Sequence, residues 1–130
     1  NADGTEVANL HAGWRGLASG IIENTIVEMK SQPAWAWLGA AISQPCFEVG
    51  AEVKVAFCEK YPELESAFII GQVEDKYQAD LYAIARFILN SLGVEIVLGG
   101  DQCSYQQAQD YFSYRRYAKT VRMATFVFLQ

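Results

Sequence analysis

Histidine, cysteine and long hydrophobic runs are scarce in this sequence. Its 130 residues include one histidine, three cysteines and three prolines. The longest apolar run, residues 34–42, is far shorter than the roughly 20 residues of a membrane-spanning helix, and no signal-peptide pattern is visible. The cysteines are odd in number and widely spaced, with no Cys-x-x-Cys pair, which favours a reducing, cytoplasmic setting over a disulfide framework. We therefore expect no association with a membrane.

Positive charge is also limited. The net charge is -5, which argues against a broad nucleic-acid-binding surface. Four of the ten basic residues nevertheless fall in one short stretch: Arg115, Arg116, Lys119 and Arg122. A cationic cluster in an acidic chain indicates either a local anion site or a solvated basic turn.

Apolar residues, in contrast, are plentiful. Hydrophobic residues make up 52% of the chain and charged residues 19%, which predicts a packed core and a single domain over residues 1–130. The sequence starts with Asn1 and not with methionine. We therefore expect a processed, excised or partly observed chain.

The hydrophobic spacing predicts a mixture of strands and helices. Strands are expected over residues 5–10, 35–42, 94–98, 111–114 and 123–129, and helices over 15–30, 50–60 and 81–92. The 35–42 and 94–98 strands have the continuous apolar character of buried strands. Gly93 stands where a helix C-terminal glycine is expected. This order favours an α/β (α+β) fold, a mixed β-sheet sandwich flanked by helices.

His11 is the first candidate for chemistry. It follows a predicted strand and precedes a turn with two glycines, Gly13 and Gly16, which let a substrate approach the backbone closely. Imidazole is a common metal ligand and general base, but a structural histidine in a core is the alternative. A catalytic zinc normally needs three protein ligands, and no local pair has ligand spacing. Arg15, in the same turn, offers two-pronged recognition of phosphate or is simply solvated.

A second candidate group lies near the C-terminus. Cys103 follows two glycines at a predicted strand end, and Ser113 precedes the pair Arg115 and Arg116. Neighbours in a strand point to opposite faces, so only one of the two arginines reaches a given pocket easily. No Walker, Rossmann or nucleophile-elbow motif is present.

Six short motifs, taken in order, resemble the YfiH family, also called the laccase-domain or multicopper polyphenol oxidase family. They are His11-Ala12-Gly13-Trp14-Arg15-Gly16, Phe47-Glu48-Val49-Gly50, Asp80-Leu81, Cys103-Ser104, Phe112-Ser113-Tyr114-Arg115-Arg116 and Arg122-Met123-Ala124. The hexapeptide at residues 11–16 is highly specific. The similarity covers the whole chain but corresponds to the C-terminal half of a typical family member.

The resemblance implies a YfiH-like fold and a zinc enzyme with purine nucleoside phosphorylase activity, together with adenosine deaminase and methylthioadenosine phosphorylase activities. The family metal site resembles two histidines and one cysteine, with His11 as the last ligand and the others in an upstream N-terminal half. Arg15 and one of Arg115 or Arg116 are expected to orient phosphate, and Cys103 and Ser113 to line the pocket. The alternatives are a copper-dependent polyphenol oxidase, an enzyme that edits peptidoglycan precursors, and an inactive fragment.

Overall fold

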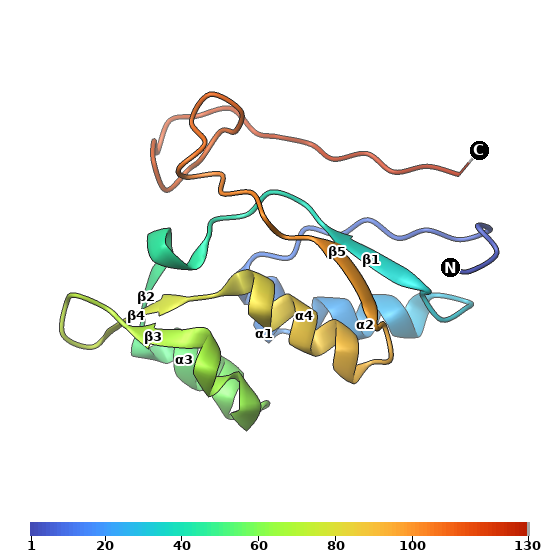
Figure 1. The fold of residues 1–130 in the computed structure, drawn as a ribbon, viewed down its shortest axis with the longest axis horizontal. Coiled ribbons are helices and arrows are strands. Elements are labelled where there is room, and N and C mark those ends of the chain that lie inside the picture. The colour runs from blue at the N-terminus through green and yellow to red at the C-terminus, as the bar shows by residue number, and fades with distance from the viewer. Residues whose placement is uncertain (130) are drawn as a thin grey trace.

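Two small sheets lie toward opposite ends of the molecule, with helices packed beside and between them (Figure 1). The computed structural model describes residues 1–129. The helices are α1 (Trp14–Ala18), α2 (Ile21–Glu28), α3 (Ala51–Cys58) and α4 (Leu81–Ser91), with 3-10 helices η1 (Gln44–Cys46) and η2 (Pro62–Ala67). The strands are β1 (Trp35–Leu38), β2 (Glu48–Gly50), β3 (Phe68–Ile70), β4 (Lys76–Ala79) and β5 (Ile96–Gly99).

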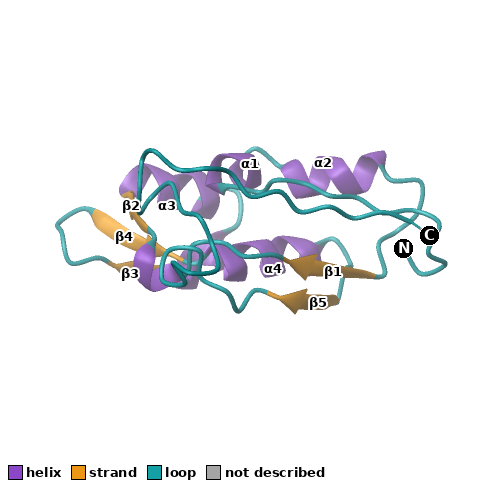
Figure 2. Cartoon of the chain, turned by 90° about the horizontal axis from the view of Figure 1, so that it is seen from above, coloured by secondary structure: helices purple, strands orange, loops and turns teal. Residues whose placement is uncertain are grey.

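The two sheets differ in strand direction. β1 pairs with β5 in parallel, with Trp35 opposite Ile96 and Leu38 opposite Gly99. The second sheet is antiparallel, in the order β2-β4-β3. Parallel and antiparallel pairing in one chain, with helices against both sheets, confirms the expected mixed α/β fold (Figure 2).

Helix α4 provides much of the core. The apolar stripe predicted a helix over residues 81–92, and the observed helix ends one residue earlier, before Gly93 with φ +83°. Ile84 and Ile88 on this stripe have no exposed surface. At the other end, a carboxylate oxygen of Asp80 accepts a hydrogen bond from the backbone N–H of Ala83 at 2.9 Å. Asp80 therefore caps the helix.

We expect Asp80→Ala in the full-length protein to lower the free energy of unfolding by about 1 kcal/mol, because it leaves a backbone donor of α4 without its cap. Urea denaturation followed by circular dichroism measures the change. Asp80→Asn keeps an acceptor and should retain most of the stability, and Asp110→Ala, at an exposed turn, is the control. Equal stability of Asp80→Ala and the wild type would contradict the role of the cap.

The predicted helix over residues 15–30 is wrong as a single element. The chain breaks it into α1 and α2 at Gly20, whose φ of +83° lies in the left-handed region. A right-handed helix cannot pass through that conformation, and glycine adopts it at little cost. The helical spacing was right on either side of Gly20, but it did not reveal the turn.

Three predicted strands, over residues 5–10, 111–114 and 123–129, are also wrong. Within residues 1–129 none of these segments joins a ladder. Alternating side chains favour an extended backbone, but a strand also needs a hydrogen-bonding neighbour. The contact between the first and last of these segments is instead a side-chain bond, from the Asn9 amide to the Thr125 carbonyl oxygen at 2.6 Å.

The strands of the parallel pair are less buried than their sequences predicted. Trp35 and Trp37 of β1 are 56% and 57% exposed, and Ile96 and Leu98 of β5 are 56% and 53% exposed. The other face of each strand is half-buried. The prediction of two fully buried strands is therefore wrong, since only one face of this sheet is covered in the described part of the chain.

The hairpin of β3 and β4 was not predicted from the hydrophobic spacing. It closes through a turn in which the N–H of Gly71 donates to the carbonyl of Lys76 at 2.8 Å, and Asp75 has φ 60°. Lys76 is the first residue of β4, the central strand of this sheet, and pairs with Gly50 of β2. None of the helices described over residues 1–129 has the length and apolar character needed to cross a membrane.

Candidate functional site

The imidazole of His11 is exposed, just ahead of α1. It lies beside Gly13, where an added Cβ would sit 3.3 Å from the His11 Nε2 atom. A side chain at position 13 would therefore crowd the ring. Because Gly13 has no side chain, the imidazole of His11 can contact a ligand from the solvent side.

Arg15 lies on the first turn of α1 and is also exposed. Its guanidinium carbon is 4.4 Å from the centroid of the Trp14 ring, a stacking distance. The flat ring restricts where the guanidinium can lie but leaves its N–H donors available.

Arg115 approaches the same place from the far end of the chain. Its Nη1 atom donates a hydrogen bond to the carbonyl of Glu48 at 3.0 Å, and its guanidinium carbon lies 5.3 Å from the Phe47 ring centroid. Arg15 and Arg115 both line a hollow of about 390 Å³ where β2 leads into α3. The hollow is lined by Trp14, Arg15, Glu48, Val49, Gly50, Glu52, Val53, Lys76 and Arg115. We call it the arginine hollow.

The arginine hollow combines three cations with two carboxylates. Lys76, the first residue of β4, joins the two arginines, and Glu48 and Glu52 supply the negative charge. Glu52 belongs to the first turn of α3, where a carboxylate is favoured by the helix dipole. Lys76 was not among the predicted site residues, because the hairpin that carries it was not predicted. The turn residues Gly71 and Asp75 were the available signal.

Arg116 points elsewhere and holds the backbone of its own loop. Its Nη1 atom donates to the carbonyls of Ser104 at 2.8 Å and Tyr105 at 2.5 Å, and its Nη2 atom donates to the carbonyl of Tyr111 at 2.6 Å. Those contacts use both terminal nitrogens of the guanidinium, while its Nε atom is buried without a partner within residues 1–129. The two neighbouring arginines therefore have different surroundings: Arg115 lines the arginine hollow, and Arg116 ties residues 104–116 together.

Cys103 and Ser113 are buried and do not line the arginine hollow. The Ser113 hydroxyl accepts a hydrogen bond from the backbone N–H of Arg116 at 3.4 Å, which places it in the same loop. Burial raises the pKa of the Cys103 thiol, but hydrogen bonds from Ser43 and from the backbone of Gln106 and Tyr105 outweigh it and lower the pKa to about 7. The expected contact of Cys103 and Ser113 with substrate stays a prediction.

The donor set over residues 1–129 does not complete a metal site. No three histidine, cysteine, aspartate or glutamate side chains gather there in a way that could hold an ion. His11 provides one imidazole, and a catalytic zinc takes three protein ligands. The described residues alone therefore do not fit a resident zinc or copper.

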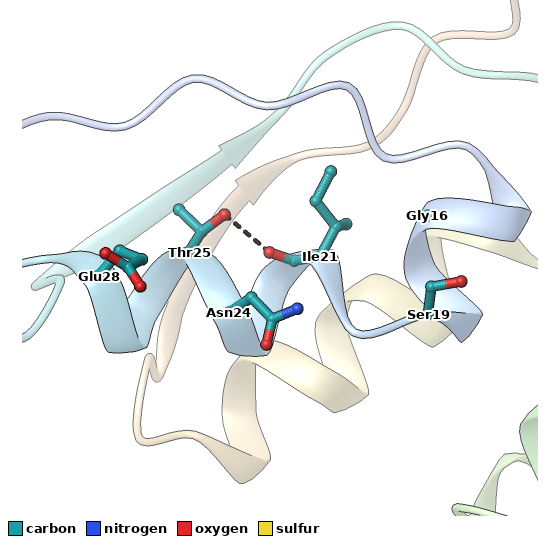
Figure 3. Close-up of a pocket in the computed structure, with 6 residues that line it drawn as sticks. All are labelled: Gly16, Ser19, Ile21, Asn24, Thr25 and Glu28. Carbon is teal, nitrogen blue, oxygen red and sulfur yellow. Dashed lines mark hydrogen bonds between the residues drawn. The ribbon is translucent and has the colours of Figure 1, made fainter.

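A second hollow of about 480 Å³ lies along α1 and α2 (Figure 3). It is lined by Gly16, Ser19, Ile21, Asn24, Thr25 and Glu28. The Thr25 hydroxyl donates to the Ile21 carbonyl of its own helix at 2.7 Å. This hollow has no lysine or arginine among its lining residues and one carboxylate, that of Glu28.

The fold and this geometry define a mixed α/β protein. Its exposed His11 and Arg15 lie at the start of α1, and Arg115 reaches the hollow from a loop near the C-terminus. The chain belongs to the multi-copper polyphenol oxidoreductase laccase family, whose model matches residues 1–130.

Curated relatives carry enzyme names. A protein of Escherichia coli named purine nucleoside phosphorylase YfiH is 48% identical over 131 residues, which is 99% of this chain and 53% of the relative. A protein from an unknown prokaryotic organism, named adenosine deaminase RL5, is 35% identical over 117 residues, 85% of this chain and 45% of the relative. The chain thus spans about half the length of the curated relatives it matches.

Solved structures agree with the fold. The crystal structure of Neisseria meningitidis protein NMB0706 matches with a TM-score of 0.77 and 51% identity, over 82% of this chain and 44% of that one. YlmD from Geobacillus stearothermophilus matches with a TM-score of 0.69 and 27% identity, over 82% of this chain and 42% of that one. These structures support the expected YfiH-like architecture.

Proposed function

We propose that the protein carrying this chain is a zinc-dependent purine nucleoside phosphorylase that works in a reducing, cytoplasmic setting and also deaminates adenosine and cleaves methylthioadenosine. The observation that carries the proposal is the meeting of Arg15 and Arg115 in one hollow, from positions 100 residues apart in the chain. The names of the relatives supply the substrate class: purine nucleosides and, for a phosphorylase, phosphate.

Phosphate binds to Arg15 and Arg115 in this proposal. Phosphorolysis breaks the glycosidic C–N bond of the nucleoside and forms a C–O bond from the anomeric carbon to phosphate, and the departing purine takes up a proton. Two guanidinium forks match phosphate oxygens and fix the direction of attack. Trp14 stacked on Arg15 and the Glu48 carbonyl bound to Arg115 restrict the side chains before the anion arrives. Lys76 adds a third positive charge at the rim.

His11 contributes one ligand to the proposed metal site, and further ligands come from polypeptide beyond the described residues. A zinc ion held there would supply a Lewis acid, although His11 itself is not among the residues that line the arginine hollow. The exposed ring beside Gly13 is compatible with such a shared site. Copper at the same position, which the family's description suggests, is the alternative for a polyphenol oxidase, but multicopper sites use many histidines and this chain has one.

The test uses the full-length protein with inosine. We expect release of hypoxanthine and ribose 1-phosphate that depends on added phosphate, and release of ammonia from adenosine that does not. Chromatography of the products measures both. A protein that retains zinc but leaves inosine intact, or that oxidises phenols only after copper is added, would overturn the proposal.

A further inference from the structure

Glu52 is a member of the arginine hollow to which the proposed phosphate site gives no role. Its side chain is exposed in the first turn of α3 and lines the hollow together with Arg15 and Arg115. Neither of the ion pairs found within residues 1–129 involves Glu52 or a cation of the hollow. The carboxylate of Glu52 is therefore available to a ligand that enters the same hollow.

Gly50 provides the space in which this carboxylate lies. Gly50 is the buried N-cap residue of α3, and a Cβ added to it would come within 2.7 Å of the Glu52 carboxyl carbon. The backbone of Gly50, with φ -80° and ψ 169°, suits any residue, so its conformation does not require glycine. The missing side chain instead leaves room for the Glu52 carboxylate against the backbone at the start of α3.

The arginine hollow has room for more than a phosphate ion. Its volume of about 390 Å³ lies in the range of about 300–1,000 Å³ that is typical of small-molecule sites. Its charged groups also differ in what they can bind. The guanidinium groups of Arg15 and Arg115 donate hydrogen bonds and match an anion, whereas an ionised carboxylate only accepts hydrogen bonds. The part of a ligand that contacts Glu52 must therefore carry O–H or N–H donors and no negative charge.

The sugar of a nucleoside meets this requirement. In phosphorolysis the new bond joins phosphate to the anomeric carbon, so the sugar lies directly beside the phosphate. Its hydroxyl groups are neutral donors, and they are attached to the ring that carries the reacting carbon. A carboxylate in the same hollow as the two arginines is thus placed to accept hydrogen bonds from these hydroxyls.

We propose that Glu52 binds the ribose hydroxyl groups of the nucleoside, beside phosphate held by Arg15 and Arg115, and so selects ribonucleosides over 2′-deoxyribonucleosides. This inference rests on the proposed phosphorolysis and adds the residue that recognises the sugar. The carboxylate accepts the hydrogen bonds and undergoes no chemical change. A substrate without the 2′-hydroxyl leaves an oxygen of Glu52 without its partner, and it is therefore cleaved less efficiently.

The test compares kcat/KM of the full-length protein for inosine and for 2′-deoxyinosine at saturating phosphate. We expect the wild type to prefer inosine by about tenfold or more, because the lost hydrogen bond is one to a charged group. Glu52→Ala should remove most of this preference, mainly by slowing inosine cleavage. Glu52→Gln keeps one acceptor oxygen and should retain part of it. A general loss of folded protein lowers both rates equally and leaves their ratio unchanged.

The matched control is Glu59→Gln. Glu59 is an exposed glutamate at the other end of α3, outside the arginine hollow, so this variant should keep the wild-type preference. A carboxylate that serves only the dipole of α3 would affect stability and not the choice of substrate. Thermal unfolding of Glu52→Ala and Glu59→Gln measures that contribution separately.

Gly50→Ala tests the position of the carboxylate while leaving Glu52 in the chain. The added methyl group takes the space of the carboxylate, and the flexible glutamate side chain moves away from it. We expect a reduced preference for inosine and a thermal unfolding midpoint close to that of the wild type. The double variant Gly50→Ala/Glu52→Ala has no carboxylate to displace, so its preference should equal that of Glu52→Ala alone.

The possible outcomes separate this inference from the proposed function. Inosine cleavage by a wild type that has no preference over 2′-deoxyinosine, or whose preference survives in Glu52→Ala, would overturn the role of Glu52 and leave phosphorolysis standing. An equal loss of preference in Glu59→Gln would also overturn it, because the effect would then belong to α3 as a whole. Wild-type protein that cleaves neither nucleoside would overturn the proposed function and this inference together.

Discussion

Replacing His11 with alanine in the full-length protein is expected to abolish both zinc retention and inosine cleavage. The imidazole is exposed beside Gly13, so its loss does not open the core. A catalytic zinc site normally has three protein ligands. Removal of one should weaken zinc binding so far that the ion is lost during purification. Plasma emission analysis of the purified variant measures the metal, and a phosphate-dependent assay measures the reaction.

The control for this variant is Asn24→Ala. Asn24 is exposed on α2 and lines the other hollow, so its replacement should change neither metal content nor rate. Thermal unfolding of both variants separates loss of the ligand from loss of the fold. Full zinc content with full activity in His11→Ala would remove His11 from the mechanism. Full zinc content with lost activity would assign the residue a role other than ligation.

Replacing Arg115 with alanine is expected to lower kcat/KM for phosphorolysis by about 10- to 100-fold, mainly through a higher KM for phosphate. One charge-assisted contact to an anion is worth about 1.5–3 kcal/mol, and 1.36 kcal/mol corresponds to a factor of ten. Arg15→Ala should behave similarly, because both side chains line the arginine hollow. Initial rates over a range of phosphate concentrations give the two parameters separately.

Deamination provides an internal control for these arginine variants, since it consumes water and no phosphate. We expect Arg115→Ala to keep most of its adenosine deaminase rate. Lys119→Ala removes a cation that does not line the arginine hollow and should leave the phosphate KM unchanged. An unchanged KM for phosphate in both Arg15→Ala and Arg115→Ala would mean that phosphate binds outside the arginine hollow.

Local pattern predicted the helices well where one face of the helix is buried. The stripe of α4 gave its bounds to within one residue, and α3 lies within the predicted helix over 50–60, with Val53 and Phe57 buried. Strand prediction was less successful, because pairing depends on neighbours distant in sequence. β1 and β5 formed in the predicted regions, but β1 ends at Leu38, short of residue 42, and β5 runs over Ile96–Gly99 and not 94–98. Residues 123–129 have the same strand-like character and no ladder.

The candidate site was predictable in its residue types but not in its assembly. The glycine turn after His11 and the paired arginines could be read from the sequence. The difference between Arg115 and Arg116 could not, because it depends on which backbone carbonyls the loop of residues 104–111 presents to a guanidinium. Lys76 could not be predicted as a lining residue of the arginine hollow, because the hairpin that brings it there was not predicted.

The near balance of charge around Arg15 and Arg115 has a consequence for selectivity. Three positive side chains stand against two negative ones, leaving a surplus of one charge before any ligand arrives. A site with so small a net charge attracts anions only weakly at long range. Selectivity between anions would then depend on how well two oxygen atoms of the anion fit the planar N–H donors of the guanidinium groups. The shape of the anion would matter more than its charge.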